Sequence, residues 1–273
     1  MVGKLFLVST PIGNMGDITL RAIETLKNAD AILAEDTRVT GKLLSALEIK
    51  KPLISYHKFS EGKKGEEILE RLFSGETLAL CSDAGMPCIS DPGEALVKRA
   101  VANGIDVVAV PGANAALTAL IASGISAEQF AFMGFFPRKK KEEEAQKIMN
   151  YPFTLIYYES PMRILETAEA LAGIMPNRQI AVARELTKMY EEFIRGTAEE
   201  VLAALRQRES IKGEIVLIIS PPEDSQKDIS DEEIAEGIKK LLNEGQTLKT
   251  AVKAVSEGYG LNKNRVYDIG KRL

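Results

Sequence analysis

Short apolar runs followed by turn-rich polar segments recur in the first half of the chain. Residues 5–8, 77–80 and 107–110 are such runs, and each leads into a segment rich in Pro, Gly, Ser, Asp or Asn. This pattern predicts a buried parallel strand that opens into a loop and then a helix. Because ligands bind outside the carboxyl ends of the strands in an open α/β sheet, the three loops should meet at one cleft.

Strand and helix patterns alternate through this first part, which predicts a parallel, doubly wound sheet. Asp17 is placed to cap the first helix, and Thr19 is also available. Pro92 is expected early in the fourth helix, where its missing N–H costs nothing. Strands are predicted at residues 4–9, 31–34, 53–56, 77–81 and 107–110, and helices at 18–28, 39–47, 65–74, 94–102 and 114–123.

The pattern changes after about residue 123. Residues 130–136 are predicted as an aromatic strand, and two short strands, at 179–184 and 191–195, follow one another without an intervening helix. This change predicts a mixed sheet in a second α/β domain, joined to the first through a linker near residues 123–128. Pro221 and Pro222 then break the chain, and an amphipathic helix follows. The tail is predicted to be helix-turn-helix-like, with Gly258-Tyr259-Gly260 joining its last two helices. The predicted domains are therefore residues 1–123, 124–222 and 223–273.

The composition is typical of a globular protein without structural disulfides. The chain of 273 residues is 45% hydrophobic, as expected for a globular protein. Its two cysteines, Cys81 and Cys88, are too few for a disulfide framework, and their spacing fits no common zinc site. No metal is therefore expected. No stretch reads as a signal peptide or a membrane span, so we expect a soluble cytoplasmic protein that does not contact a membrane.

The three loops, together with residues 34–38 and 183–188, resemble the tetrapyrrole methylase superfamily and, within it, the ribosomal RNA small subunit methyltransferase I family. The resemblance runs from about Lys4 to Ser220. It implies a two-domain α/β fold with S-adenosylmethionine in the interdomain cleft, plus a small C-terminal helical module. It also implies methyl transfer to the ribose 2′-oxygen of a cytidine in 16S rRNA, with the small ribosomal subunit as partner, and a homodimer.

S-adenosylmethionine carries no phosphate, so a glycine-rich phosphate loop is not required, and the sequence has none. Asp83 would face the polar end of the cofactor, although a turn Asp can also bond its own backbone. Arg184 and Glu185 could form a surface ion pair instead of bordering adenine. The resemblance implies that the cofactor lies against Pro11, Ile12, Gly13, Asp83, Ala84, Gly85, Met86, Asn114, Ala115, Tyr158, Ala183, Leu186 and Ile215.

Methyl transfer to a ribose hydroxyl needs in-line geometry and removal of a proton late in the reaction. Candidate bases at the strand ends are Glu35, Asp36, His57 and Glu159. We favour Asp36 as base or orienter, with Arg38 contacting a phosphate or the 2′-oxygen. The alternative is a helix-capping acid paired with a nearby Arg. The family often has a second His and an Asn near the position of His57, and this chain lacks both.

A net charge of −4 means that affinity for RNA must come from local basic patches. Residues 138–141 are basic, but the acidic residues 142–144 follow and could pair with them along a helix. Residues 246–273 hold six Lys or Arg against two acidic residues. That tail could instead only stabilise the fold. Two other functions remain open: methylation of a corrin or porphyrin, and a ribosome-assembly factor without chemistry.

Overall fold

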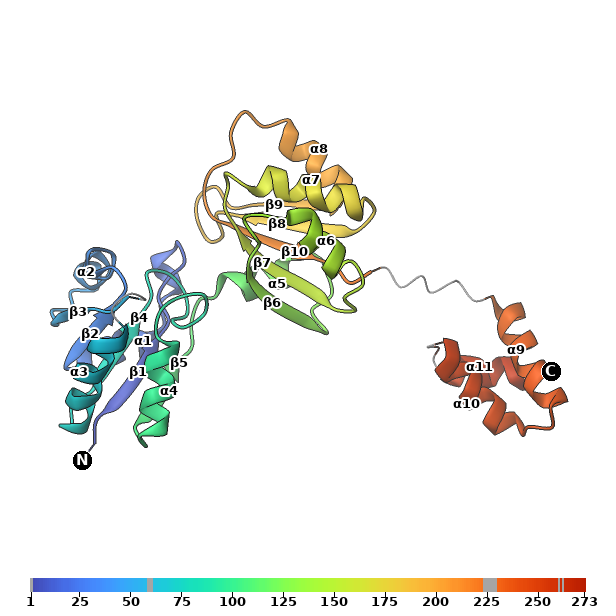
Figure 1. Cartoon of the computed structure of the whole chain (residues 1–273), viewed down its shortest axis with the longest axis horizontal. Coiled ribbons are helices and arrows are strands. Elements are labelled where there is room, and N and C mark those ends of the chain that lie inside the picture. The colour runs from blue at the N-terminus through green and yellow to red at the C-terminus, as the bar shows by residue number, and fades with distance from the viewer. Residues whose placement is uncertain (1, 58–60, 223–229, 260, 262) are drawn as a thin grey trace. The chain divides into compact units, whose positions relative to one another are not determined.

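The chain forms two compact units, Met1–Pro221 and Pro222–Leu273. The computed structural model describes residues 2–57, 61–222, 230–259, 261 and 263–273 (Figure 1). The first unit contains two five-stranded sheets. The second unit is helical. This architecture confirms the predicted α/β fold with an added C-terminal helical module.

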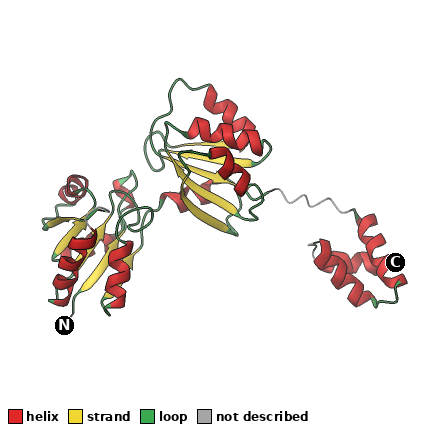
Figure 2. Ribbon diagram, in the orientation of Figure 1, coloured by secondary structure: helices red, strands yellow, loops and turns green. Residues whose placement is uncertain are grey.

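The first sheet is parallel and carries helices on both faces (Figure 2). Helices α1 (Leu20–Asn28) and α2 (Thr37–Ala46) pack on one face, around Leu26 and Leu44. Helices α3 (Glu61–Phe73) and α4 (Glu94–Ala102) pack on the other, around Leu72 and Leu96. The strands are β1 (Lys4–Val8), β2 (Ala31–Ala34), β3 (Leu53–Ser55), β4 (Leu78–Cys81) and β5 (Asp106–Val110), in the order β3-β2-β4-β1-β5.

Two details at helix starts differ from the prediction. Thr19 caps α1 by accepting a hydrogen bond from the Ala22 N–H at 3.0 Å, whereas Asp17 lies in a preceding 3-10 turn, η1 (Met15–Asp17). Helix α4 begins after Pro92, with Gly93 as its N-cap residue. Gly93 has φ +127°, and a Cβ there would meet Leu80 at 2.6 Å. The chain therefore turns sharply at Gly93 before the helix can start.

The second sheet is mixed, as predicted. Strands β6 and β7 pair in parallel, and the other pairs are antiparallel. Helices α6 (Lys141–Ile148), α7 (Ile164–Ile174) and α8 (Ala198–Arg206) cover one face. Helix α5 (Ala115–Ser123) packs on the other face. The strands are β6 (Phe130–Phe135), β7 (Thr154–Glu159), β8 (Gln179–Arg184), β9 (Glu192–Thr197) and β10 (Ile215–Ile219), in the order β6-β7-β10-β8-β9.

An irregularity in β6 decides which way one aromatic side chain points. Phe132 pairs with Ile156 and Phe135 pairs with Tyr158, so two residues of β6 lie opposite one residue of β7. Gly134 adopts φ +74° at this bulge. Side chains three apart in a regular strand point to opposite faces, and one extra residue restores them to the same face. Phe135 therefore shares a face with Phe132.

The C-terminal unit has its own apolar core. Helix α9 (Asp231–Asn243) packs with α10 (Leu248–Tyr259) and α11 (Lys263–Gly270) through buried residues such as Ile238, Val252 and Val266. The three predicted helices are present. The predicted joining turn is wrong at Gly258 and Tyr259, which continue α10, and Gly260 lies outside the described residues. Among the described residues, no helix is both long and apolar enough to cross a membrane.

Candidate functional site

The carboxyl ends of the first sheet open into a cavity of 480 Å³. This volume lies within the usual range of small-molecule sites. The loops after β1, β2, β4 and β5 form one side of the cavity, and the ends of β7 and β10 form the other. Ten of the thirteen predicted cofactor residues line it: Ile12, Asp83, Ala84, Gly85, Met86, Asn114, Ala115, Tyr158, Leu186 and Ile215.

Three predicted residues lie outside the cavity lining found among the described residues. Ala183 is fully buried in the core between α5 and the second sheet. Gly13 packs against Lys188, where an added Cβ would lie 2.6 Å from the Lys188 Cγ. Pro11 precedes Ile12, which does line the cavity. These three residues therefore support the wall from behind or beside it.

Backbone hydrogen bonds fix the loops after β1 and β4 to each other. The Thr10 N–H donates to the Gly85 carbonyl at 2.9 Å, and the Gly85 N–H donates to the Thr10 carbonyl at 3.1 Å. Gly85 has φ +80°, and a Cβ there would lie 3.3 Å from Ile12. A side chain at Gly85 would be strained and would press on the wall of the cavity.

Helix α5 begins at the cavity. The Asn114 side chain caps it by accepting a hydrogen bond from the Leu117 N–H at 3.0 Å. Its first residues, Asn114 and Ala115, line the cavity, and Ala119 and Leu120 pack against the second sheet. This one element therefore connects the cavity wall to the core of the second sheet.

Five acidic residues line the cavity, and the pKa is raised for three of them: Glu35, Asp83 and Asp91. Desolvation raises the pKa of Glu35, and the negative charges of Asp83 and Asp36 add to this. Desolvation also raises the pKa of Asp83. The pKa of Asp91 is raised to about 6, first by desolvation and then by the charge of Glu35. The cavity is thus prepared for a positively charged group, which would relieve the repulsion among these carboxylates.

Asp36 and Arg38 form a close pair beside this acidic group. The Asp36 side chain caps α2 by accepting a hydrogen bond from the Arg38 N–H at 2.8 Å, and its ion pair with the Arg38 guanidinium measures 2.5 Å. The hydrogen bonds from Arg38 lower the pKa of Asp36 to about 2. The Asp36 N–H in turn donates to the Asp83 carboxylate at 3.1 Å. A carboxylate with this pKa is a weak proton acceptor, so the geometry favours an orienting role.

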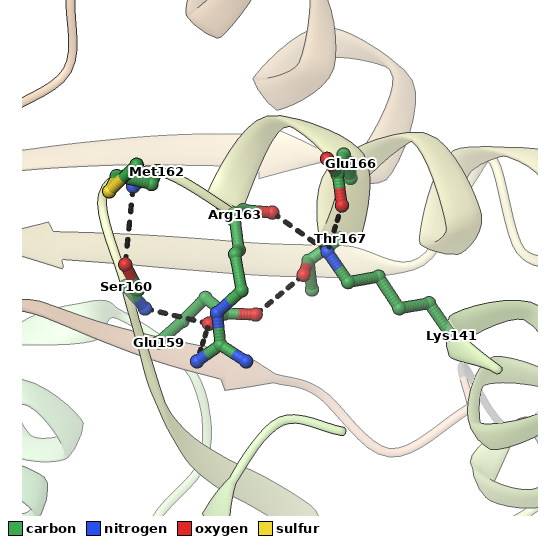
Figure 3. Close-up of polar contacts among 7 residues, drawn as sticks. All are labelled: Lys141, Glu159, Ser160, Met162, Arg163, Glu166 and Thr167. Atoms are coloured by element: carbon green, nitrogen blue, oxygen red, sulfur yellow. Dashed lines mark hydrogen bonds and ion pairs between the residues drawn. The ribbon is translucent and has the colours of Figure 1, made fainter. Parts of the chain in front are cut away.

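The turn after β7 is held by a buried carboxylate (Figure 3). The Glu159 side chain, which is fully buried, accepts hydrogen bonds from the Ser160 N–H and the Thr167 hydroxyl, both at 2.6 Å, and pairs with Arg163 at 2.8 Å. Lys141 joins this group by donating to the Arg163 carbonyl. Because Ser160 and Pro161 line the cavity, these contacts fix part of its wall. Glu159 is thereby committed to structure rather than free to accept a substrate proton.

Ion pairs also order the segments after β8 and before β10. Arg184 pairs with Glu192 at 3.1 Å, and Lys188 pairs with both Glu185 and Glu214. Arg184 and Glu185 thus each form an ion pair with another residue, and their place beside adenine stays a prediction. Glu214 lines the cavity, so Lys188 links that wall to the β8–β9 turn.

Several lining residues were not predicted as site residues. Asp91 belongs to the Asp91-Pro92-Gly93 sequence that predicts the start of the fourth helix and supports the assignment of the Asp83 loop, and Phe135 belongs to the predicted aromatic strand. A glycine inside a strand is the one local signal of a bulge, and Gly134 carried it. Others are Ile89, Ser90, Ser160, Pro161 and Val216.

One further candidate base can be placed. His57 follows β3 and lies near the acidic group, since its electrostatic effect lowers the pKa of Glu35. Its catalytic role stays a prediction. No group of three or more potential metal ligands is found in the described part of the chain.

Comparison with known proteins identifies the relatives of this chain. Residues 4–202 match the model of the tetrapyrrole (corrin/porphyrin) methylases. A ribosomal RNA small subunit methyltransferase I from Bacillus subtilis (strain 168) is 47% identical over 277 residues, covering 98% of this chain and 94% of that protein. A protein of the same name from Haemophilus influenzae is 43% identical, covering 99% of this chain and 97% of that protein.

Solved structures share the fold at low sequence identity. A diphthine synthase is 14% identical with a TM-score of 0.63, over 80% of this chain and 90% of that one. The uroporphyrin-III C-methyltransferase of Thermus thermophilus, in complex with S-adenosylhomocysteine, is 19% identical with a TM-score of 0.56, over 80% and 97%. At these identities, the likeness concerns the fold.

Proposed function

We propose a reaction from the premise that this chain belongs to the tetrapyrrole methylase superfamily and, within it, to the ribosomal RNA small subunit methyltransferase I family. The proposed reaction is transfer of a methyl group from S-adenosylmethionine to the ribose 2′-oxygen of a cytidine in 16S rRNA. The chain covers nearly the full length of relatives that carry this family name, which supports rRNA of the small subunit as the substrate. The observation that carries the cofactor assignment is the acidic cavity at the strand ends.

The residues of the cavity fit S-adenosylmethionine. Apolar side chains such as Ile12, Leu186 and Ile215 suit the adenine ring. Asp83 and Asp91 suit the cationic methionine end. Desolvation, and to a lesser extent neighbouring carboxylates, raise their pKa values, and a bound cation would stabilise their ionised forms. The S-adenosylhomocysteine in the Thermus thermophilus neighbour supports this choice. The cofactor supplies a methyl group activated by a positively charged sulfur.

Other residues at the cavity would orient the ribose that receives the methyl group and accept the proton of its hydroxyl. Glu35 lines the cavity and has a raised pKa, so it is a better acceptor for the hydroxyl proton than Asp36, whose pKa is about 2. We propose that Asp36 orients Arg38, which is 86% exposed in its side chain and can contact a phosphate of the substrate. Positioning of the ribose hydroxyl would supply much of the rate.

The proposal includes two features of the whole protein. We propose domain boundaries near residues 123 and 222, and a homodimer, as the family resemblance implies. Exposed apolar side chains on α5, Leu117 and Ile121, support an association surface. Light scattering at micromolar concentration should give twice the monomer mass, and a monomer mass would refute the dimer.

Labelled methyl transfer is the direct test. The protein is incubated with labelled S-adenosylmethionine and either purified small subunits or naked 16S rRNA, and the rRNA is digested to nucleosides. We expect label in 2′-O-methylcytidine. Asp83→Ala serves as the matched variant, and we expect it to bind the cofactor about 5- to 150-fold more weakly, because a polar ligand group loses its partner.

Other results would redirect the assignment. Label on a base would refute the 2′-oxygen, and label in an added porphyrinogen instead of RNA would favour a tetrapyrrole substrate. Cofactor binding without any transfer would favour an assembly factor. Unchanged cofactor affinity in Asp83→Ala would remove that residue from the site.

A further inference from the structure

Phe135 is an exposed aromatic ring at the mouth of the cavity. It lines the cavity, yet it is 58% exposed. The bulge in β6 turns it to the same face as Phe132. Both rings form T-shaped contacts with Tyr158, with centroid distances of 5.6 Å for Phe135 and 4.9 Å for Phe132. Tyr158 and Phe132 belong to the apolar core under α5, so they hold Phe135 from below. The result is a supported ring with a free face, which is what a base needs for stacking.

Two cations follow this ring along the chain. Arg138 and Lys139 are exposed, and neither forms an ion pair with any described residue. Their neighbours behave differently, since Lys140 pairs with Glu143 and Lys141 pairs with Glu166. The acidic residues that follow in the sequence therefore leave Arg138 and Lys139 uncompensated. Arg138 and Lys139 lie three and four residues beyond Phe135. Four residues of extended chain span about 14 Å at most, so both cations stay near the ring.

We propose that residues 135–139 form the RNA-binding lip of the site: Phe135 stacks on a base of a single-stranded segment next to the target ribose, and Arg138 and Lys139 contact its phosphates. This inference rests on the proposed function. Proteins that bind single strands combine aromatic rings, on which bases stack, with cations that contact the phosphates. The exposed ring and the two cations without ion-pair partners provide both components. A stem would not expose a base face to Phe135, so the lip selects an unpaired segment.

The experiment compares kcat/KM for methyl transfer at several salt concentrations, with small subunits or naked rRNA, whichever the wild-type protein methylates. Phe135→Ala should lower kcat/KM roughly 5- to 150-fold, and Phe135→Tyr should restore it because the ring is kept. The double variant R138A/K139A should flatten the slope of log kcat/KM against log salt by about 1.4, the value for two phosphates of a single strand.

Lys50→Ala with Lys51→Ala is the matched charge control. These lysines precede β3, at the edge of the sheet opposite the cavity, so the slope should keep its wild-type value. Calorimetry with S-adenosylmethionine completes the test, because R138A/K139A should bind it as the wild type does. Wild-type kcat/KM and slope in both lip variants would overturn the inference and leave the proposed function standing. Loss of cofactor affinity in Phe135→Ala that accounts for its whole defect would also overturn it. If wild-type protein methylates no RNA, the proposed function fails, and the lip fails with it.

Discussion

The pKa values of three carboxylates that line the cavity, Glu35, Asp83 and Asp91, are raised above their ordinary values. Asp91 shows this most strongly, with a pKa of about 6 against an ordinary value of 3.8. The main cause is desolvation, and the charges of Glu35 and Asp83 add to it. The folded protein therefore binds more protons than the unfolded chain between pH 4 and 6, roughly, and the contribution of Asp91 to stability is lost as the pH rises through that window.

The titration of Asp91 predicts how binding of S-adenosylmethionine should depend on pH. A cationic ligand favours the ionised carboxylate, so affinity should rise as the pH increases through about 6 and level off above about 7. At pH 5 it should be about one tenth of the plateau value, the ionised fraction at that pH. Asp91→Asn should flatten this dependence when the dissociation constant is measured by calorimetry across the range.

The same variant carries its own structural control. Because the raised pKa costs stability at neutral pH, Asp91→Asn should be at least as resistant to urea there as the wild-type protein. A flat binding profile would then reflect the lost carboxylate rather than a damaged fold. Retention of the wild-type pH profile in Asp91→Asn would show that another group, with Glu35 the first candidate, titrates in this range.

Among the secondary-structure elements, α5 has two tasks, since it lines the cavity at its start and packs on the second sheet along its length. Asn114→Ala removes its cap and should cost about 1 kcal/mol in the free energy of unfolding. Because the Asn114 side chain itself lines the cavity, cofactor affinity should fall as well. Asn114→Ser keeps a capping oxygen and should recover most of both losses.

Thr197→Ala is the matched control for the cap of α5. Thr197 caps α8 in a capping box with Glu200, and α8 covers the face of the second sheet away from α5. Its loss should cost a similar free energy of unfolding in a denaturant titration while cofactor affinity stays unchanged. Equal losses of affinity in Asn114→Ala and Thr197→Ala would mean that global stability, and not the start of α5, governs binding.

The bounds of helices and strands could be predicted from the sequence where local chemistry alone determines them. Buried strands such as β2 and β8 have the predicted bounds, because continuous apolar runs have few alternatives. Choices between neighbouring residues failed, as with Asp17 and Thr19, because both are good caps and packing decided between them. The Phe135 platform was missed because a bulge reverses the alternation that the sequence pattern assumes.

In the site too, the positions of some residues follow from the local sequence, whereas the positions of others depend on the tertiary fold. Asp83 and its neighbours follow a strand, so their place at the cavity could be predicted. Asp91 lies just before the sharp turn at Gly93, and its electrostatic interaction with Glu35 depends on how two separate loops fold. The pairing of Asp36 with Arg38 was foreseen as an alternative, but the low pKa that results required the hydrogen-bond geometry.

For the molecule as a whole, excess positive charge is concentrated near the end of the chain. The chain has a net charge of −4, yet residues 246–273 hold six Lys or Arg against two acidic residues. The apolar cores of the first unit contain no residue from beyond Pro221, and the tail has its own core around Ile238 and Val252. Each unit can therefore be changed without opening the core of the other.

Truncation after Pro221 should leave the binding of S-adenosylmethionine intact, because every lining residue of the cavity precedes that point. Methylation of RNA should fall, and its salt dependence should become shallower, since fewer counterions are released. The truncated chain should then be combined with R138A/K139A. If the tail and the lip contact different phosphates, their effects on the free energy of RNA binding should add, because distant sites act independently. A full methylation rate and an unchanged salt slope in the truncated chain would make the tail a structural appendage and leave the residue 135–139 lip and Arg38 as the RNA surface.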